Sequence, residues 1–254
     1  GVSTGFIALD HKTAGLHGSE LILVAARPAM GKTAFALNIA TNAAVRGKVP
    51  VAIFSLEMSK DQLVNRILCS EAMVDSNKVR TGKLDEQDWA KLASSLGPLS
   101  ESEIYIDDTP GISVMEIRAK CRKLKLEKNI GLVVIDYLQL ISIEDKNSGE
   151  QELSNIGLSL KKIAEELKIP ILITSQLSRK PDIRFKAGQD PRPTLKDFGY
   201  SSGIIKYADI IMLLYKDDYY NPNSNKKSVL EINIAKNKNV RLGTVIIKKL
   251  YNLK

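Results

Sequence analysis

An apolar run that ends in a short loop and leads into an alanine-rich helix constrains this chain more than any other feature. Leu21 to Val24 carry no charge, which is typical of a parallel strand buried on both faces. The residues that follow are Ala26, Arg27, Pro28, Ala29, Met30, Gly31, Lys32 and Thr33. A Gly-Lys-Thr triplet between a strand and a helix predicts a phosphate-binding loop, in which Lys32 binds the terminal phosphates and the Thr33 hydroxyl binds Mg²⁺. The general pattern has Gly where this chain has Ala26, and a surface Gly-Lys turn is the alternative interpretation.

Length and composition limit the class of protein further. The 254 residues suffice for one large α/β domain with a core of its own. No apolar run approaches the ~20 residues that cross a bilayer, and the first residues do not resemble a signal peptide. We therefore expect a soluble, cytoplasmic protein with no membrane partner. Cys69 and Cys121 are the two cysteines, and no Cys/His spacing predicts a zinc site.

Short aliphatic runs alternate with helical patterns, which predicts an α/β fold with a mostly parallel central sheet and flanking helices. Strands are predicted at 21–25, 51–56, 104–106, 132–137, 171–175 and 210–215, and helices near 32–46, 60–73, 86–96, 114–127 and 152–167. Two later β-type runs, 229–234 and 244–250, predict an antiparallel hairpin at the sheet edge. Residues 142–149 and 178–202 are predicted to be loops. No linker divides the chain, so we expect a single domain over 1–254.

Polar side chains follow three of the predicted strands, at the point where each strand ends. Glu57 follows the second strand, Asp136 ends the fourth and Gln176 ends the fifth. Ligands of open α/β sheets bind at the carboxyl ends of the strands, so these residues are candidates for catalysis. Glu57 can activate water, Asp136 can hold the magnesium sphere, and Gln176 can hydrogen-bond a γ-phosphate. Glu57 and Gln176 can also lack a chemical role, whereas an unpaired Asp136 is costly to bury.

The net charge of +8 is concentrated toward the end of the chain. From Lys216 to Lys254 there are nine Lys or Arg against three acidic residues, which leaves 28 against 26 before that point. A polyanionic partner and a solvated Lys-rich face both explain this excess. Charge alone therefore does not identify a nucleic-acid-binding protein.

Together these segments resemble the C-terminal, RecA-like ATPase domain of the DnaB-family replicative helicases. The resemblance rests on the phosphate loop, on Ser55-Leu-Glu-Met58, on Ile135-Asp-Tyr-Leu-Gln-Leu140 and on Ser175-Gln-Leu-Ser-Arg179, which follow the family's order and spacing. Ala at position 26 is usual in that family. The resemblance covers nearly the whole chain, and what is missing is the family's N-terminal helical domain.

The resemblance implies a P-loop NTPase with ATP and Mg²⁺ as cofactors. It assigns phosphate and magnesium binding to Lys32 and Thr33, water activation to Glu57, ordering of the magnesium sphere to Asp136 and sensing of the γ-phosphate to Gln176. It also implies a homohexameric ring that translocates 5′→3′ on single-stranded DNA and unwinds duplex at the fork. A helicase loader and primase are the expected partners of the full-length protein.

Two segments depart from the family pattern. Where the family usually has Asp-Leu-Arg-Glu-Ser-Gly, this chain has Asp197-Phe-Gly-Tyr-Ser-Ser-Gly203, so the Arg-Glu pair is absent. Near the C-terminus the family's Lys and Arg reach the neighbouring ATP, and here the corresponding residues are Lys236 and Lys238, expected on the turn of the hairpin. The departures indicate a divergent, phage or mobile-element member. They also leave open a RecA-like ATP-binding ring that binds DNA or protein without unwinding.

The predicted loop at 178–203 is the expected path of single-stranded DNA inside the ring. Basic side chains offer phosphate contacts and aromatic ones can stack on bases, a mode worth ~1–3 kcal/mol per base. The residues concerned are Arg179, Lys180, Arg184, Lys186, Arg192, Phe198 and Tyr200. A flexible basic loop with a buried Phe is the alternative.

Overall fold

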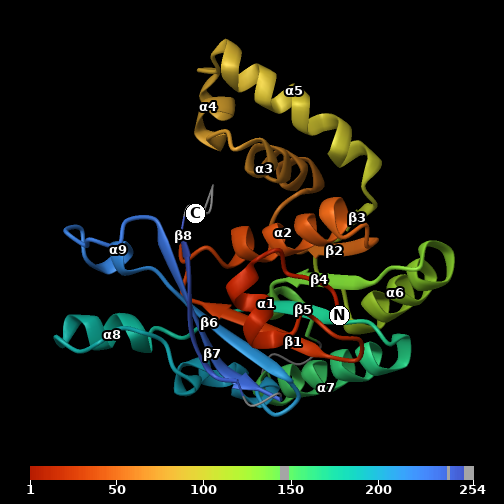
Figure 1. Ribbon diagram of the computed structural model, residues 1–254. Helices are drawn as coiled ribbons and strands as arrows, with labels where there is room; N and C mark the ends of the chain where they lie inside the picture. The colour runs from red at the N-terminus through yellow and green to blue at the C-terminus, as the bar shows by residue number, and fades with distance from the viewer. Residues whose placement is uncertain (144–148, 239–240, 249–254) are drawn as a thin grey trace.

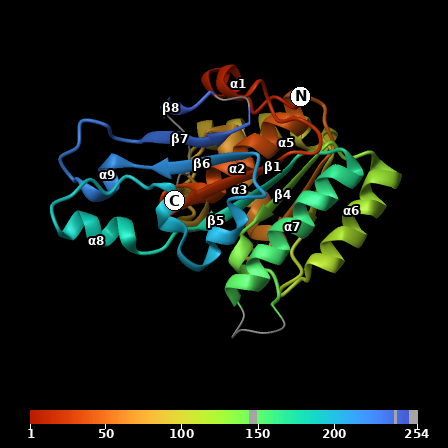
Figure 2. The same ribbon diagram turned by 90° about the horizontal axis from the view of Figure 1, so that it is seen from below.

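The computed structural model describes residues 1–143, 149–238 and 241–248, and these form one twisted sheet with helices on both faces (Figures 1 and 2). The strands are β1 (Leu21–Ala26), β2 (Val51–Ser55), β3 (Ile104–Asp107), β4 (Leu132–Asp136), β5 (Ile171–Gln176), β6 (Ile210–Tyr215), β7 (Val229–Asn237) and β8 (Gly243–Lys248). The helices are α1 (Ile7–Thr13), α2 (Lys32–Thr41), α3 (Lys60–Ala72), α4 (Ser76–Thr81), α5 (Glu86–Glu101), α6 (Val114–Lys128), α7 (Gly149–Leu167), α8 (Lys180–Lys186) and α9 (Asp217–Tyr220). The π-helical segment η1 (Asn42–Arg46) and the 3₁₀-helical segments η2 (Leu138–Leu140) and η4 (Leu195–Ile204) complete the described helices.

The sheet confirms the predicted strand arrangement. Its order is β3-β2-β4-β5-β1-β6-β7-β8, with parallel pairing from β3 through β6 and antiparallel pairing of β7 and β8. Ala26 lies opposite Gln176, and Ser55 lies opposite Asp136. The register therefore aligns the carboxyl ends of β1, β2, β4 and β5 at one edge of the sheet.

The core lies in two layers, one on each face of the sheet. Because side chains alternate along a strand, Ile22 and Val24 of β1 pack on one face, in the cluster that contains Phe35 of α2. Leu21 and Leu23 belong to the cluster on the other face, beneath α6 and α7 (Figure 2). The central strand is therefore buried on both sides, as its uninterrupted aliphatic sequence predicts.

Helices α3, α4 and α5 form a separate layer beyond α2 (Figure 1). A small apolar cluster of their own, with Cys69, Val74 and Leu92, holds them together. Capping boxes fix the beginnings of α3 and α5, at Ser59 and Asp85 respectively. This layer begins directly after Glu57, so it borders the edge where the strands end.

The structure also corrects several expectations. The predicted loop at 178–202 contains α8 and η4, because Pro181 begins one helix and Thr194 caps the other with Asp197. Lys236 lies within β7 instead of on the hairpin turn. The sequence analysis did not predict α1, α4 or α9. Residues 144–148 of the first predicted loop, 239–240 of the turn and 249–250 of the last predicted strand lie outside the described residues.

Candidate active site

The phosphate loop connects the end of β1 to the beginning of α2, as predicted. Ala29 and Gly31 have positive φ, 65° and 84°, which turns the backbone sharply before the helix begins. Gly31 occupies the N-cap of α2, and the first helical residues are Lys32 and Thr33. No side chain caps this end of α2, so its first N–H groups are available to bind an anion.

Lys32 lies between two carboxylates at the edge of the sheet. Its Nζ is 3.6 Å from Asp136 Oδ1 and 3.9 Å from Glu57 Oε2. The same ammonium lies 4.2 Å from the centroid of the Tyr137 ring. Burial of Tyr137, together with the charges of Glu57 and Asp136, raises the pKa of its hydroxyl. The structure thus brings together residues that are about a hundred positions apart in the sequence.

Asp136 is held by hydroxyl groups on both sides. Thr33 Oγ1 donates to Oδ2 at 2.8 Å, and Thr174 Oγ1 from the neighbouring strand β5 donates to Oδ1 at 2.5 Å. The residue is only 4% exposed, so the two hydroxyls and Lys32 compensate a carboxylate that would be costly to bury alone. The sequence analysis identified Asp136 and Thr33 but not Thr174.

Glu57 differs from Asp136 in its accessibility. Its side chain is 53% exposed, and it follows β2 at the point where the chain turns toward α3. Arg66 of α3 lies near both carboxylates. Burial lowers the pKa of the Arg66 guanidinium, and the negative charges of Asp136 and Glu57 oppose that effect. Sequence reasoning missed Arg66, which is one of two basic residues on α3 and has no motif of its own.

Gln176 ends β5 beside the phosphate loop, and a second amide holds its backbone. Gln139 Nε2 donates to Ser175 Oγ and to the Gln176 carbonyl, both at 3.0 Å. The Gln176 N–H donates back to Gln139 Oε1 at 3.1 Å. Gln139 therefore fixes the strand end from which the Gln176 side chain extends. Its position three residues after Asp136 is the signal that identifies it.

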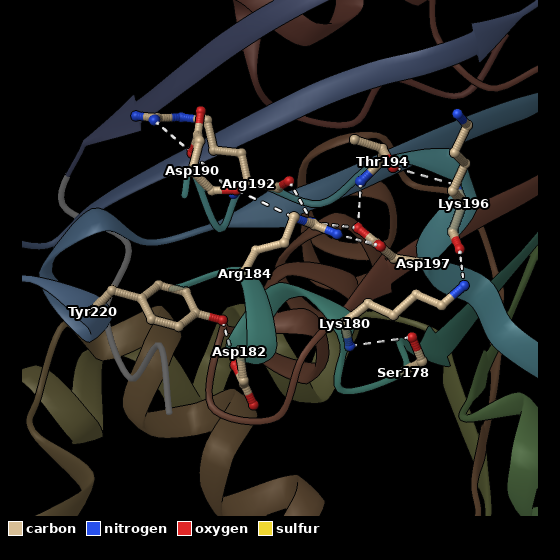
Figure 3. Close-up of polar contacts among 10 residues, drawn as sticks. All are labelled: Ser178, Lys180, Asp182, Arg184, Asp190, Arg192, Thr194, Lys196, Asp197 and Tyr220. Carbon is tan, nitrogen blue, oxygen red and sulfur yellow. Dashed lines mark hydrogen bonds and ion pairs between the residues drawn. The ribbon is translucent and has the colours of Figure 1, made fainter. Parts of the chain in front are cut away.

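Three of the residues expected to contact DNA make their contacts within the chain, and Figure 3 shows two of them, Arg184 and Arg192. Phe198 is 1% exposed, so the expectation that it stacks on bases is wrong for this structure. Arg184 forms two hydrogen bonds of 2.7 Å with the buried carboxylate of Asp197. Arg192 donates to both carboxylate oxygens of Glu231, at 3.2 and 3.1 Å. Each of these two guanidinium groups therefore neutralises a buried acid of its own chain.

The other candidates in this segment are exposed. Tyr200 is 56% exposed, and Arg179, Lys180 and Lys186 lie on the surface of the segment at and within α8. Lys180 Nζ donates to the Lys196 carbonyl at 3.1 Å. DNA binding by these four residues stays a prediction.

Lys236 and Lys238 lie far from the phosphate loop of their own chain. Lys236 pairs with Ile211 in the first half of β6, and its Nζ donates to the Ile205 carbonyl at 2.9 Å. Lys238 Nζ is 3.7 Å from Glu20 Oε2, just before β1. Both lysines are therefore at the amino-terminal edge of the parallel strands, opposite the edge that carries Lys32.

Within residues 1–143, 149–238 and 241–248, no group of three or more His, Cys, Asp or Glu side chains is arranged to hold a metal ion. Across the same ranges, none of the helices combines the length and apolarity needed to span a bilayer.

Comparison with known proteins identifies the family. The model of the DnaB-like helicase C terminal domain matches residues 1–253. The chain is 53% identical to the replicative DNA helicase DnaB of Geobacillus stearothermophilus over 247 residues, which is 96% of this chain and 54% of that protein. It is 52% identical to the replicative DNA helicase DnaC of Bacillus subtilis (strain 168) over 256 residues, covering 99% of this chain and 56% of that protein. The chain thus spans about half the length of the curated relatives it matches.

Two solved structures share the fold. One is described as an ATPase domain, with a TM-score of 0.90 and 38% identity over 96% of this chain and 86% of that one. The other is described as a DnaB-like replicative helicase and its interactions with primase, with a TM-score of 0.91 and 38% identity over 97% of this chain and 59% of that one. These matches confirm both the predicted RecA-like α/β fold and the resemblance drawn from the sequence motifs.

Proposed function

The chain belongs to the DnaB-like helicase C-terminal domain family, and we propose that it is the ATP-hydrolysing motor domain of a replicative DNA helicase. One observation carries the proposal. Lys32, Glu57 and Asp136 come from three separate strand ends and meet within 3.9 Å of one ammonium group. A lysine at the N-terminus of a helix, with one acid available for Mg²⁺ and another for the attacking water, is the set of groups that P-loop enzymes use for phosphoryl transfer.

The residues present fit a magnesium ion. Thr33 Oγ1 and the Asp136 carboxylate are oxygen ligands of the kind that Mg²⁺ prefers, and a 2.8 Å hydrogen bond already joins them. We assign the ion to these two residues together with phosphate oxygens. When bound, it would supply positive charge to the β- and γ-phosphate oxygens of ATP.

Three residues of the chain then have separate roles in hydrolysis. Lys32 leaves its two carboxylate partners and neutralises charge on the terminal phosphates. Glu57, half exposed and next to Lys32, orients the attacking water and accepts its proton. Gln176, whose backbone is fixed by Gln139, hydrogen-bonds the γ-phosphate and reports its loss to the segment that follows.

The assembly proposed is a homohexameric ring in which each ATP lies at a contact between subunits. Lys236 and Lys238 reach the ATP of the adjacent subunit. Single-stranded DNA runs along the 178–203 segment, where the exposed Arg179, Lys180, Lys186 and Tyr200 contact it, and the motor moves 5′→3′. A helicase loader and primase are the proposed partners of the longer protein to which this domain belongs.

A second candidate function is an ATP-binding ring that binds DNA without unwinding it. Gly199, which replaces the family's usual Arg, favours this alternative. It has φ 61° and ψ −130°, a conformation that other residues rarely adopt, and it offers no side chain at the expected DNA contact.

Hydrolysis is tested first with two substitutions and two matched controls. Lys32→Ala removes the positive charge that neutralises the terminal phosphates and is expected to abolish ATP hydrolysis. Glu57→Gln is expected to keep nucleotide binding and to lower turnover by about 10²–10⁴-fold, the usual contribution of a general base. Lys91→Ala and Glu101→Gln alter exposed residues of α5 and should leave both quantities unchanged. Wild-type turnover in Glu57→Gln would remove Glu57 from the mechanism.

Strand displacement on forked DNA then separates the two functions. ATP, but not a non-hydrolysable analogue, should support displacement by the helicase motor. Hydrolysis and DNA binding without displacement would favour the alternative ring protein. Absence of hydrolysis in the wild-type chain would refute the motor, and absence of ATP binding would refute both functions.

A further inference from the structure

Helix α8 belongs to the 178–203 segment proposed to bind DNA, and it lies between the phosphate loop and the 190–197 part of that segment. It has seven residues, and Asp182 and Arg184 are two positions apart on it. Two positions correspond to about 200° around a helix, so these side chains extend in roughly opposite directions. Asp182 contacts the phosphate loop. Arg184 contacts the 190–197 segment (Figure 3).

Asp182 binds the arginine of the phosphate loop. Arg27 Nε and Nη2 donate to Asp182 Oδ2 at 3.2 and 2.9 Å, and Arg27 Nη1 donates to the Leu177 carbonyl at 3.0 Å. The Arg27 side chain is only 15% exposed. It therefore extends toward the end of β5 and α8, where these three hydrogen bonds hold it.

Tyr220 completes this contact from the other side. Its hydroxyl donates to Asp182 Oδ1 at 2.5 Å, and its ring lies 5.0 Å from that of Phe185. Burial opposes ionisation of Asp182, but the hydrogen bonds from Tyr220 and Arg27 hold the pKa of the carboxyl below its usual value. A lowered folded-state pKa means that the pair contributes stability at neutral pH and loses it only as the pH falls into the acid range.

Arg184 binds the opposite segment at three points. Its guanidinium pairs with both oxygens of Asp197, which is fully buried. It also donates to the carbonyls of Asp190 and Arg192, at 3.2 and 2.9 Å. The hydrogen bond with Asp197 raises the pKa of Arg184, so its charge persists at any working pH. The Arg184 side chain therefore attaches the backbone from 190 to 197 to α8, and Lys180 of the same helix adds a hydrogen bond to the Lys196 carbonyl.

We propose that α8 couples the phosphate loop to the DNA-binding segment, with Asp182 and Arg184 as the positioning residues at its two contacts. The inference rests on the proposed function, because it requires that DNA binds the 178–203 segment. A displacement of that segment by DNA moves Arg184 and the short helix with it, and Asp182 transmits the movement to Arg27. Nucleotide in the loop affects DNA binding by the same route, since coupling between two ligands is reciprocal.

The test measures this coupling at equilibrium in the whole chain. The Kd of a fluorescent ADP analogue is measured with and without saturating oligo(dT), and the ratio of the two values is the coupling. A ratio of about 5–150-fold in either direction is expected for the wild type, the usual range for two coupled sites. Asp182→Ala removes the contact with Arg27 and should bring the ratio close to 1.

Two further variants separate coupling from simple loss of structure. Glu101→Gln removes an exposed acid of α5, outside the 178–203 segment, and should keep the wild-type ratio. Asp182→Glu restores the carboxylate and should recover part of the coupling. If Asp182→Ala unfolds below the assay temperature, Tyr220→Phe replaces it as the test of the coupling. This substitution removes one hydrogen bond to Asp182 and leaves the Arg27 pair in place, so it should lower the ratio by a smaller factor.

Each outcome has one meaning. A ratio near 1 in Asp182→Ala, with oligo(dT) still bound, supports the inference. An unchanged ratio in that variant, whether or not both affinities weaken together, overturns the inference and leaves the proposed function standing. If the wild-type chain binds the ADP analogue but no oligo(dT), the proposed DNA-binding function fails, and the inference fails with it.

Discussion

Asp197→Ala should destabilise the protein substantially, because Asp197 organises the segment between α8 and η4. Its carboxylate is fully buried and accepts hydrogen bonds from Arg184 at 2.7 Å on each oxygen. Oδ2 also accepts from the Thr194 N–H at 2.8 Å, which forms the capping box of η4. Alanine leaves the Thr194 N–H without its partner, and it leaves the Arg184 guanidinium without its carboxylate and with the carbonyls of Asp190 and Arg192 alone.

The expected loss follows from the burial of the two charges. Removing one partner of a buried ion pair costs about 3–5 kcal/mol. The Arg184 side chain is 26% exposed, so water can partly solvate it after the substitution, and we expect the lower end of that range. In a domain of this size each kcal/mol lowers Tm by about 2–4 °C, so about 3 kcal/mol corresponds to roughly 6–12 °C.

Differential scanning calorimetry without nucleotide or DNA measures the change directly. Asp190→Ala is the matched control, since that carboxylate is 62% exposed and its contact with Arg192 is a surface ion pair. We expect the control to lie within about 1 kcal/mol of the wild type. If Asp197→Ala melted within about 2 °C of that control, less than the shift that 1 kcal/mol produces, the argument that this pair organises the segment would be refuted.

Three further predictions concern the surface, the core and the subunit contact. Neutralising the three exposed basic residues Arg179, Lys180 and Lys186 should flatten the slope of log K against log salt for single-stranded DNA by about 2, which filter binding measures; an unchanged slope removes them from the DNA site. Burial raises the pKa of the Cys121 thiol to about 12, so alkylation by iodoacetamide at about pH 8 should require unfolding, as mass spectrometry can show. Lys238→Arg should raise DNA-stimulated ATP turnover and Lys238→Ala should lower it with little change in nucleotide affinity, because a planar guanidinium binds phosphate oxygens in two places. Mixing Lys32→Ala chains with Lys236→Ala/Lys238→Ala chains should restore some hydrolysis, and no recovery in rings shown to be mixed would reject the contact between subunits.

The sheet and the main helices could be predicted because their signals are local. The aliphatic run of β1 and the Asp that ends β4 are readable in a few residues, and parallel pairing then places Asp136 beside Thr174 and close to Thr33. The strand ends identified from sequence are therefore the strand ends that form the candidate site. Gln139 was readable in the same way, since it belongs to the motif that contains Asp136.

The 178–203 segment could not be predicted in the same way, because its structure depends on distant partners. A basic loop with aromatic residues is typical of nucleic-acid binding, yet Arg192 pairs with Glu231, 39 residues away, and Phe198 is buried in the core. The local signals were present but weak: Pro181 for the start of α8, and Thr194 followed three residues later by Asp197 for the capping box of η4. Composition shows that Arg184 is charged but not that its charge is neutralised inside the chain.

The strand register gives a geometric reason why Lys236 and Lys238 would act on a neighbouring subunit. Lys236 pairs with Ile211 of β6, and Ile211 pairs with Leu23 near the beginning of β1, whereas the phosphate loop follows the other end of that strand. Neither lysine can reach the phosphate loop of its own chain unless β7 separates from the sheet. In a head-to-tail ring, one edge of each sheet can face the opposite edge of the next subunit's sheet. A lysine that lies far from the ATP site of its own chain is then available to the ATP site of the neighbouring subunit. The Lys238 ammonium, 3.7 Å from the buried Glu20, is then a charge held in position until a neighbouring phosphate competes for it.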